Sequence, residues 1–186
     1  RPGRDYRATA SAREEFGGGV LRELSHEFDY LRWIFGDFQW VAGWTGRQSE
    51  LEIDVADTAH LNFGFVEHTG SPVVGQLSLD FVRHDRTRSI LAICERGTLR
   101  WDGVALCVEQ WRESGSQWDL LYTEDHANPT TYELQWDSFH KALQGGLEPE
   151  VTGDDGLEVL RVIDAVTASH DADGARQFLA KSEVSG

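Results

Sequence analysis

The sequence contains no methionine, two cysteines and four prolines, and none of its apolar runs approaches the roughly 18 residues that a membrane-spanning helix needs. A natural reading frame begins with methionine, whereas this chain of 186 residues begins at Arg1. We therefore expect a piece of a longer protein, with part of the function carried upstream. The length suits one domain with extensions, which we place at residues 1–186, with residues 1–16 as a leading segment.

Positive charge is scarce, because 17 lysines and arginines face 32 aspartates and glutamates, for a net charge of -15. A surface of this sign repels phosphates, which argues against a nucleic-acid partner.

Cys94 and Cys107 form no CxxC pair and lie in strand-like segments. They are predicted to be buried free thiols of a protein in a reducing compartment, the cytoplasm, and no membrane partner is expected.

The sequence also lacks the common motifs of zinc sites, of serine nucleophiles and of nucleotide-binding loops. The seven histidines form no HxxxH or HExxH pair, so a zinc site is not expected. No serine occupies a GxSxG turn. Three glycines at 17–19 precede a helical pattern, but they lack the GxGxxG spacing and no strand leads into them. No cofactor site is therefore predicted within this chain alone.

Alternation with period two dominates the middle of the sequence. It predicts strands at 39–47, 57–65, 73–82, 89–95, 98–101, 104–111 and 117–122, with Asp102-Gly103 as a hairpin turn. Consecutive strands with short turns indicate an antiparallel sheet. The second face of this sheet carries mixed residues, so it either meets solvent or meets another subunit.

Helical spacing appears at both ends of the chain. Ala8 to Glu15 suits a short helix, and the apolar stripe Val20, Leu24, Phe28, Leu31 and Phe35 predicts one helix that ends at Gly36. A later stripe is formed by Tyr132, Trp136, Phe139 and Leu143, and Gly145-Gly146 ends it. Thr152 and Asp155 begin a last helix whose buried face comprises Leu157, Val159, Leu160, Val162, Ile163 and Val166. The predicted fold class is α+β, an open, mostly antiparallel sheet with helices packed on one face.

The leading segment holds Arg1, Arg4, Arg7 and Arg13 in an otherwise acidic chain. One interpretation is a solvated segment. The other is that some of these arginines lean over a cleft and contact an anionic ligand.

A polar line on the first long helix is the main candidate for chemistry. Glu23, His26 and Asp29 follow at spacings of three, so they project from a similar side, away from Leu24. A histidine exchanges a proton near neutral pH, and carboxylates accept hydrogen bonds from polyol hydroxyls. The alternative is an ordinary helix surface with a satisfied histidine and two solvated acids.

Three stretches together resemble a known family. They are GGGVLRELSHEFDYLRWIFGD, LSLDFVRHDRTRSILAICERGTLRWDG and VTGDDGLEVLRVIDAVTASHDADG. In this order they resemble the C-terminal domain of the glucose–fructose oxidoreductase / inositol dehydrogenase family (Gfo/Idh/MocA), and they cover most of the chain. In whole members an open antiparallel sheet with helices on one side follows a Rossmann domain, which binds NAD(P) and supplies a catalytic lysine.

The resemblance implies the substrate-binding and oligomerisation domain of an NAD(P)-dependent sugar or polyol oxidoreductase. His26 would be the acid/base, and Asp29 and Glu23 would bind substrate. The first acid departs from the pattern, since many members place it four residues before the histidine, where this chain has Arg22. NAD or NADP would be bound mainly by the upstream domain, so the isolated chain is expected to be inactive. A homo-oligomer would form through the sheet. The segments RDYR and AREEFGGG resemble those of members in nucleotide-sugar metabolism. The alternative is a non-catalytic sugar-binding or dimerisation module of the same fold.

Overall fold

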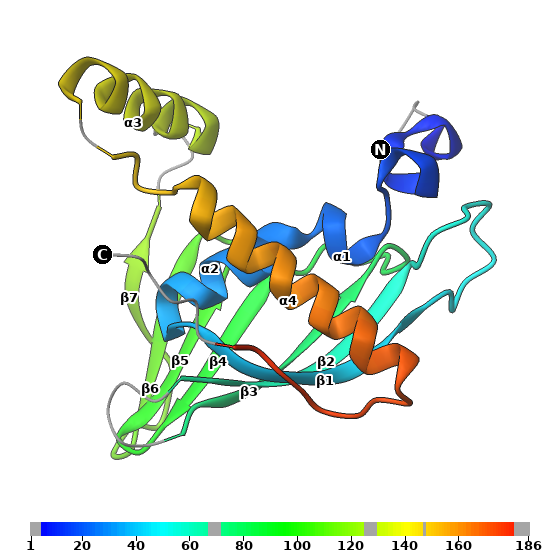
Figure 1. The fold of residues 1–186 in the computed structure, drawn as a ribbon. Helices are drawn as coiled ribbons and strands as arrows, with labels where there is room; N and C mark the ends of the chain where they lie inside the picture. The colour runs from blue at the N-terminus through cyan, green and yellow to red at the C-terminus, as the bar shows by residue number, and fades with distance from the viewer. Residues whose placement is uncertain (1–4, 67–71, 125–129, 147, 181–186) are drawn as a thin grey trace. The chain divides into compact units, whose positions relative to one another are not determined.

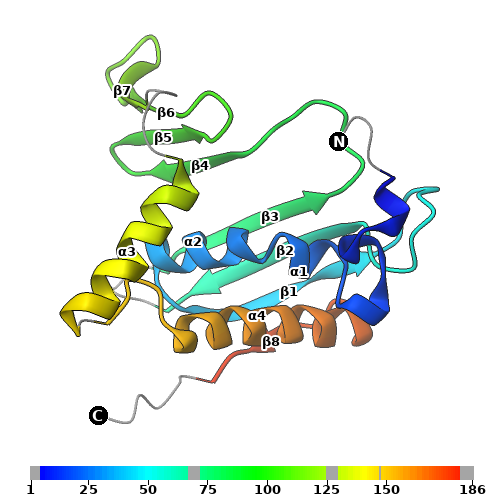
Figure 2. The same ribbon diagram turned by 90° about the horizontal axis from the view of Figure 1, so that it is seen from above.

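A computed structural model describes residues 5–66, 72–124, 130–146 and 148–180. The chain divides into a first unit, residues 1–82 and 151–186, and a second unit, residues 83–150. Each unit contains one four-stranded antiparallel sheet (Figures 1 and 2). The α+β class with antiparallel sheets and helices is confirmed, but the described strands are shared between two sheets, whereas the sequence predicted one.

The first unit begins with three short 3₁₀ helices, at Tyr6–Ala8, Ala10–Ala12 and Glu14–Phe16. The predicted helix over 8–15 is therefore wrong. The backbone at Thr9 and Arg13 is extended, which interrupts each turn before a helical hydrogen-bond ladder can form. Gly17 and Gly19 follow with φ of 72° and 110°, values that glycine adopts without strain.

The predicted helix over 20–35 is broken into α1, Val20–Glu23, and α2, Ser25–Phe35. Leu24 lies between them with φ of -103° and ψ of 26°. Leucine is a strong helix former, so the break arises from packing and not from local propensity. Gly36 ends α2 with φ of 94°, which confirms the predicted stop.

The sheet of the first unit has the strand order β3-β2-β1-β8. Its strands are β1 (Phe38–Gly46), β2 (Thr58–Phe65), β3 (Val74–Asp80) and β8 (Gln177–Phe178). The first three agree with prediction to within a few residues at each end. Val41 pairs with Phe63, and Leu61 pairs with Leu77.

Helix α4, Gly153–Asp171, packs on β1, and α2 packs beside α4 (Figures 1 and 2). The core between the helices and the sheet includes fully buried Phe28, Val41 and Val166. Ser169, also fully buried, accepts a hydrogen bond from the Gly43 amide and donates one to the Ala175 carbonyl. This serine ties the end of α4 to β1 and to the segment that leads into β8.

The start of α4 is as predicted. Thr152 and Asp155 form a capping box, and Asp155 also pairs with Arg32 of α2 at 2.6 Å. The Thr152 amide, Arg32 and the Thr152 hydroxyl together lower the pKa of Asp155 to about 2. Leu157 and Leu160, however, are 53% and 49% exposed, so the buried face is narrower than predicted. It comprises Val159, Val162, Ile163 and Val166.

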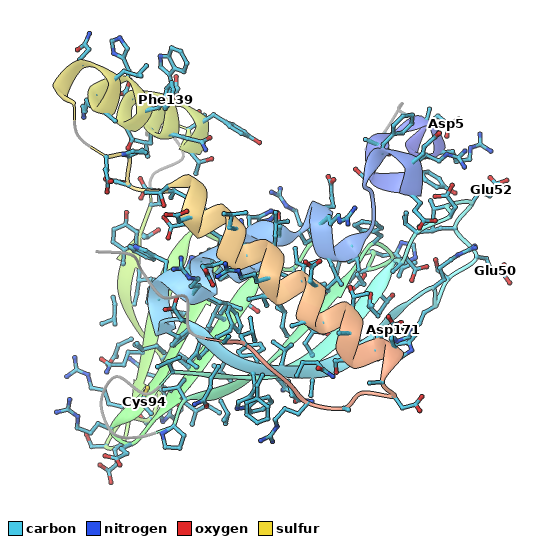
Figure 3. All side chains as sticks on the ribbon, viewed as in Figure 1. Asp5, Glu50, Glu52, Cys94, Phe139 and Asp171 are labelled. Atoms are coloured by element: carbon cyan, nitrogen blue, oxygen red, sulfur yellow. The ribbon has the colours of Figure 1, made fainter. Side chains whose placement is uncertain are left out.

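The second unit contains a sheet in the order β4-β5-β6-β7. Its strands are β4 (Ser89–Cys94), β5 (Gly97–Asp102), β6 (Cys107–Arg112) and β7 (Asp119–Thr123). The β5–β6 connection is longer than the predicted two-residue hairpin, because Asp102 accepts the amides of Val104 and Ala105 and holds a wider turn. The cysteines are free, as predicted, but Cys94 is exposed and Cys107 half-buried. Both had been expected to be buried, and Cys94, labelled in Figure 3, is the last residue of β4, next to the turn into β5.

Helix α3, Thr131–Gly145, completes the second unit and begins with a capping box between Thr130 and Glu133. Gly146 follows in the left-handed region with φ of 62°, as the predicted stop requires. Within the described chain none of the helix's side chains is buried, and the predicted stripe is exposed: Tyr132, Trp136, Phe139 and Leu143. No described helix is long and apolar enough to cross a membrane.

Candidate active site

The polar side of α2 brings a histidine next to a buried acid. His26 lies in the first turn, and its side chain is 53% exposed. Its Nε2 is 3.1 Å from Oε1 of Glu27, whose side chain is only 9% exposed. The hydroxyl of Tyr30, one turn further along, donates to Oε2 of the same carboxylate. An exposed imidazole is therefore held against a carboxylate that is shielded from water.

Glu27 was missed because the sequence reasoning followed positions three residues from His26, whereas Tyr30 was expected to border this polar line. A signal for Glu27 was present in the sequence. It lies three residues after Leu24 and four before Leu31, and so on the apolar stripe of the helix. An acid within an apolar stripe is unusual, because a buried carboxylate is costly unless it is paired. That signal predicts a specific partner for Glu27.

The break at Leu24 changes the predicted line of three. Glu23 ends α1 and is exposed, whereas His26 and Asp29 belong to α2. Asp29 is half-buried. The structure thus brings His26 into contact with Glu27, and it places Glu23 on a separate helical segment.

The glycine turn before α1 does not fit a nucleotide diphosphate. A phosphate at a helix N-terminus needs free backbone amides. Here the amides of Gly17, Gly18 and Gly19 donate to the carbonyls of Glu14, Arg13 and Ser11, and the Val20 amide donates to Ala56. A Cβ on Gly18 would lie 2.4 Å from the Ala10 carbonyl oxygen. These glycines allow tight chain packing and leave no cradle for phosphate oxygens.

The arginines of the leading segment that the structure describes are paired within the chain. Arg7 contacts Asp5 and Glu52, each at 2.8 Å, and lowers the pKa of Asp5 (Figure 3). Arg13 lies 3.5 Å from Asp54. These pairs favour the solvated-segment interpretation for Arg7 and Arg13, whereas Arg1 and Arg4 lie outside the described residues.

A groove of about 980 Å³ lies in the second unit, at the turn that joins β4 to β5 and beside the end of β6. Its lining includes Cys94, Leu99, Gln110 and Arg112, and it does not include His26. Among the described residues, no three His, Cys, Asp or Glu side chains gather closely enough to hold a metal ion. His26 with Glu27 and Tyr30 on α2 is therefore the candidate active site.

A histidine in contact with a carboxylate on a helix occurs in many classes of protein. Comparison with known proteins identifies the family of this chain. A family profile described as "Oxidoreductase family, C-terminal alpha/beta domain" matches residues 4–175. The chain belongs to this family, the Gfo/Idh/MocA oxidoreductases, and corresponds to its C-terminal domain.

Solved structures with the same fold include two enzymes bound to NADH. The WlbA dehydrogenase from Bordetella pertussis, in complex with NADH and UDP-GlcNAcA, is 26% identical with a TM-score of 0.71, over 97% of this chain and 51% of that one. A levoglucosan dehydrogenase, in complex with NADH and levoglucosan, is 15% identical with a TM-score of 0.76, over 93% and 54%. The chain thus spans about half the length of these relatives. A search of curated proteins gave no match.

Proposed function

We propose that this chain is the substrate-binding and oligomerisation domain of an NAD(P)-dependent oxidoreductase of sugars or polyols, nucleotide sugars included. The observation that carries the proposal is an exposed histidine beside a buried carboxylate, in a chain of an oxidoreductase family. The relatives bound to NADH and to UDP-GlcNAcA or levoglucosan support the substrate class. The two free cysteines are compatible with a cytoplasmic protein.

The roles within this chain follow from chemistry. His26 takes the proton of the hydroxyl that is oxidised, because an imidazole exchanges protons near neutral pH. Asp29 and Glu23 accept hydrogen bonds from other hydroxyls of the substrate. A nicotinamide, when bound, accepts the hydride from the carbon. Because the glycine turn does not fit a diphosphate, we assign the nucleotide to a domain outside this chain.

A titration of the 186-residue chain tests this assignment. Calorimetry with NAD, NADP and their reduced forms should show no saturable binding near micromolar concentrations, since the amides at the start of α1 are already engaged. A clear isotherm would place the nucleotide site within this chain and would contradict its assignment to another domain. The positive control is a longer form of the protein that includes the nucleotide-binding domain. Assays of sugar oxidation by this longer form with NAD or NADP test the proposed function.

The substitution Asp29→Asn should raise the apparent KM of that longer form about tenfold and change kcat little, because it weakens a hydrogen bond made in both the ground and transition states. Steady-state kinetics over a range of sugar concentrations would measure both constants. An equal fall of kcat and kcat/KM would instead give Asp29 a role in the proton transfer.

A second candidate function is a non-catalytic sugar-binding or dimerisation module. The sheet of the second unit favours association, since Leu91 and Ile93 of β4 and Leu120 of β7 are 56%, 80% and 61% exposed. The register places them on one face, with the Arg100–Glu109 ion pair between Leu91 and Leu120. Exposed apolar side chains on a sheet are typical of protein interfaces. The same surface serves the oligomerisation that we propose for the enzyme.

The chain should therefore sediment as a dimer or larger species at tens of micromolar. Ile93→Lys should shift the distribution toward monomer, because it replaces the most exposed apolar side chain of this face by an unpaired charge. Val73→Lys, an exposed substitution in the first unit, is the matched control. A wild-type monomer at every concentration would contradict association through this sheet.

A further inference from the structure

The contact between His26 and Glu27 restricts where the imidazole carries its proton. Oε1 of Glu27 is 3.1 Å from Nε2 of His26, and the Tyr30 hydroxyl donates to the other oxygen. An ionised carboxylate only accepts hydrogen bonds. Beside an ionised Glu27, a bare Nε2 would place its lone pair against a carboxylate oxygen, which is repulsive, so the contact favours hydrogen on Nε2.

We propose that Glu27 is a positioning residue that holds His26 in its Nε2–H tautomer and leaves Nδ1 to accept the proton of the substrate. This inference rests on the proposed function, in which His26 is the acid/base. Tyr30 supports the arrangement by fixing the carboxylate from its other side. Glu27 acts through His26 and is not itself in contact with the reacting atoms.

Among the described residues, no other carboxylate near α2 forms an ion pair with the His26 ring. On the packed helix α4, Asp155 pairs with Arg32 and Glu158 pairs with Arg161. On α1, Arg22 and Glu23 are exposed, and Asp29 is half-buried on α2 itself. Glu27 is the carboxylate that the structure places in contact with the ring. Its burial also demands a partner, since an uncompensated buried carboxylate is strongly destabilising.

The proton step is balanced with these groups. The substrate O–H bond breaks as an N–H bond forms at Nδ1, while Nε2 keeps its hydrogen beside Glu27. The carbon that bears this oxygen loses its hydrogen as hydride, which a bound nicotinamide would accept, and the carbon–oxygen bond becomes a carbonyl. The positive charge that develops on the imidazole lies next to the carboxylate of Glu27, which stabilises it more than it stabilises the neutral ring.

Nitrogen NMR of the ¹⁵N-histidine-labelled chain tests the tautomer directly, at about pH 8, where imidazoles are ordinarily neutral. His26→Asn identifies the His26 signals by their loss. We expect Nε2 protonated and Nδ1 bare in the wild type, with the Nδ1–H population rising about threefold to tenfold in Glu27→Ala. Glu27→Gln retains a carbonyl acceptor and should restore the Nε2–H form. His60, whose Nδ1 lies 2.6 Å from Ser78 Oγ, is an internal control that should not respond.

Kinetics of the longer form gives an independent readout. Glu27→Ala should lower kcat about tenfold with KM unchanged, Glu27→Gln should recover part of the loss, and Tyr30→Phe should have a smaller effect. The proposal is wrong if wild-type His26 carries its hydrogen on Nδ1, or if Glu27→Ala leaves the tautomers unchanged. If the tautomers respond but His26→Asn keeps full turnover, the positioning contact is supported and the proposed function is overturned.

Discussion

Replacement of His26 by asparagine should lower kcat of the form that includes the nucleotide-binding domain by roughly 10²–10⁴-fold. This is the usual contribution of a positioned group that transfers a proton in the transition state. Asparagine keeps a polar side chain of similar reach but cannot take the hydroxyl proton. Steady-state kinetics with a saturating nucleotide would measure the loss.

Folding should change little in this variant, because the His26 side chain is 53% exposed, the Tyr30 hydroxyl still donates to Glu27, and the asparagine amide can donate to the other carboxylate oxygen. A thermal melt beside the kinetics separates a loss of chemistry from a loss of structure. His60→Asn is the matched control, since His60 is an exposed histidine on β2 of the same unit. Full turnover in His26→Asn would favour the non-catalytic module over the enzyme.

Loss of the Asp57 side chain should cost about 3–5 kcal/mol of folding free energy, the range for breaking a buried charged network. Asp57 is fully buried at the start of β2. Its carboxylate accepts the amides of Gln48 and Ser49 and the hydroxyls of Ser49 and Thr58. Asp57→Ala leaves these donors without the acceptor that the carboxylate supplies, and the Thr58 hydroxyl among them is buried. Urea unfolding at neutral pH would measure the difference.

The acid dependence of this effect gives a second check. Burial opposes ionisation of Asp57, yet the donors from Ser49, Gln48 and Thr58 lower its pKa overall. The ionised carboxylate therefore stabilises the fold above its ordinary pKa of about 4, and the stabilisation is lost as the pH falls below that value. The difference in the free energy of unfolding between wild type and Asp57→Ala should therefore decrease as the pH is lowered. Glu50→Ala, an exposed acid in the same loop, should change stability by less than about 0.5 kcal/mol at either pH.

Sequence reasoning predicted the elements whose signals are local. The strands β1 to β3 alternate apolar and polar residues against a one-sided core, and Thr152 with Asp155 caps α4 through their own side chains. The break at Leu24 had no local signal in the sequence, because leucine favours helix. The division of the strands between two sheets depends on pairings that periodicity does not specify. At the candidate active site, spacing and chemistry selected His26, whose catalytic role stays a prediction, and they did not select Glu27, which the structure places in contact with it.

The first unit is assembled from two separated stretches of chain, and this affects its synthesis. Strands β1 to β3 leave the ribosome early, but α4, which covers β1, and β8, which pairs with it, come from the last stretch. Val41 and the neighbouring apolar side chains stay uncovered until residues 83–150 have been translated. Nascent chains that stall in that interval expose an open apolar sheet, a target for chaperones and proteases. A premature stop before residue 151 would therefore remove the whole first unit as a stable body, and not only its last helix.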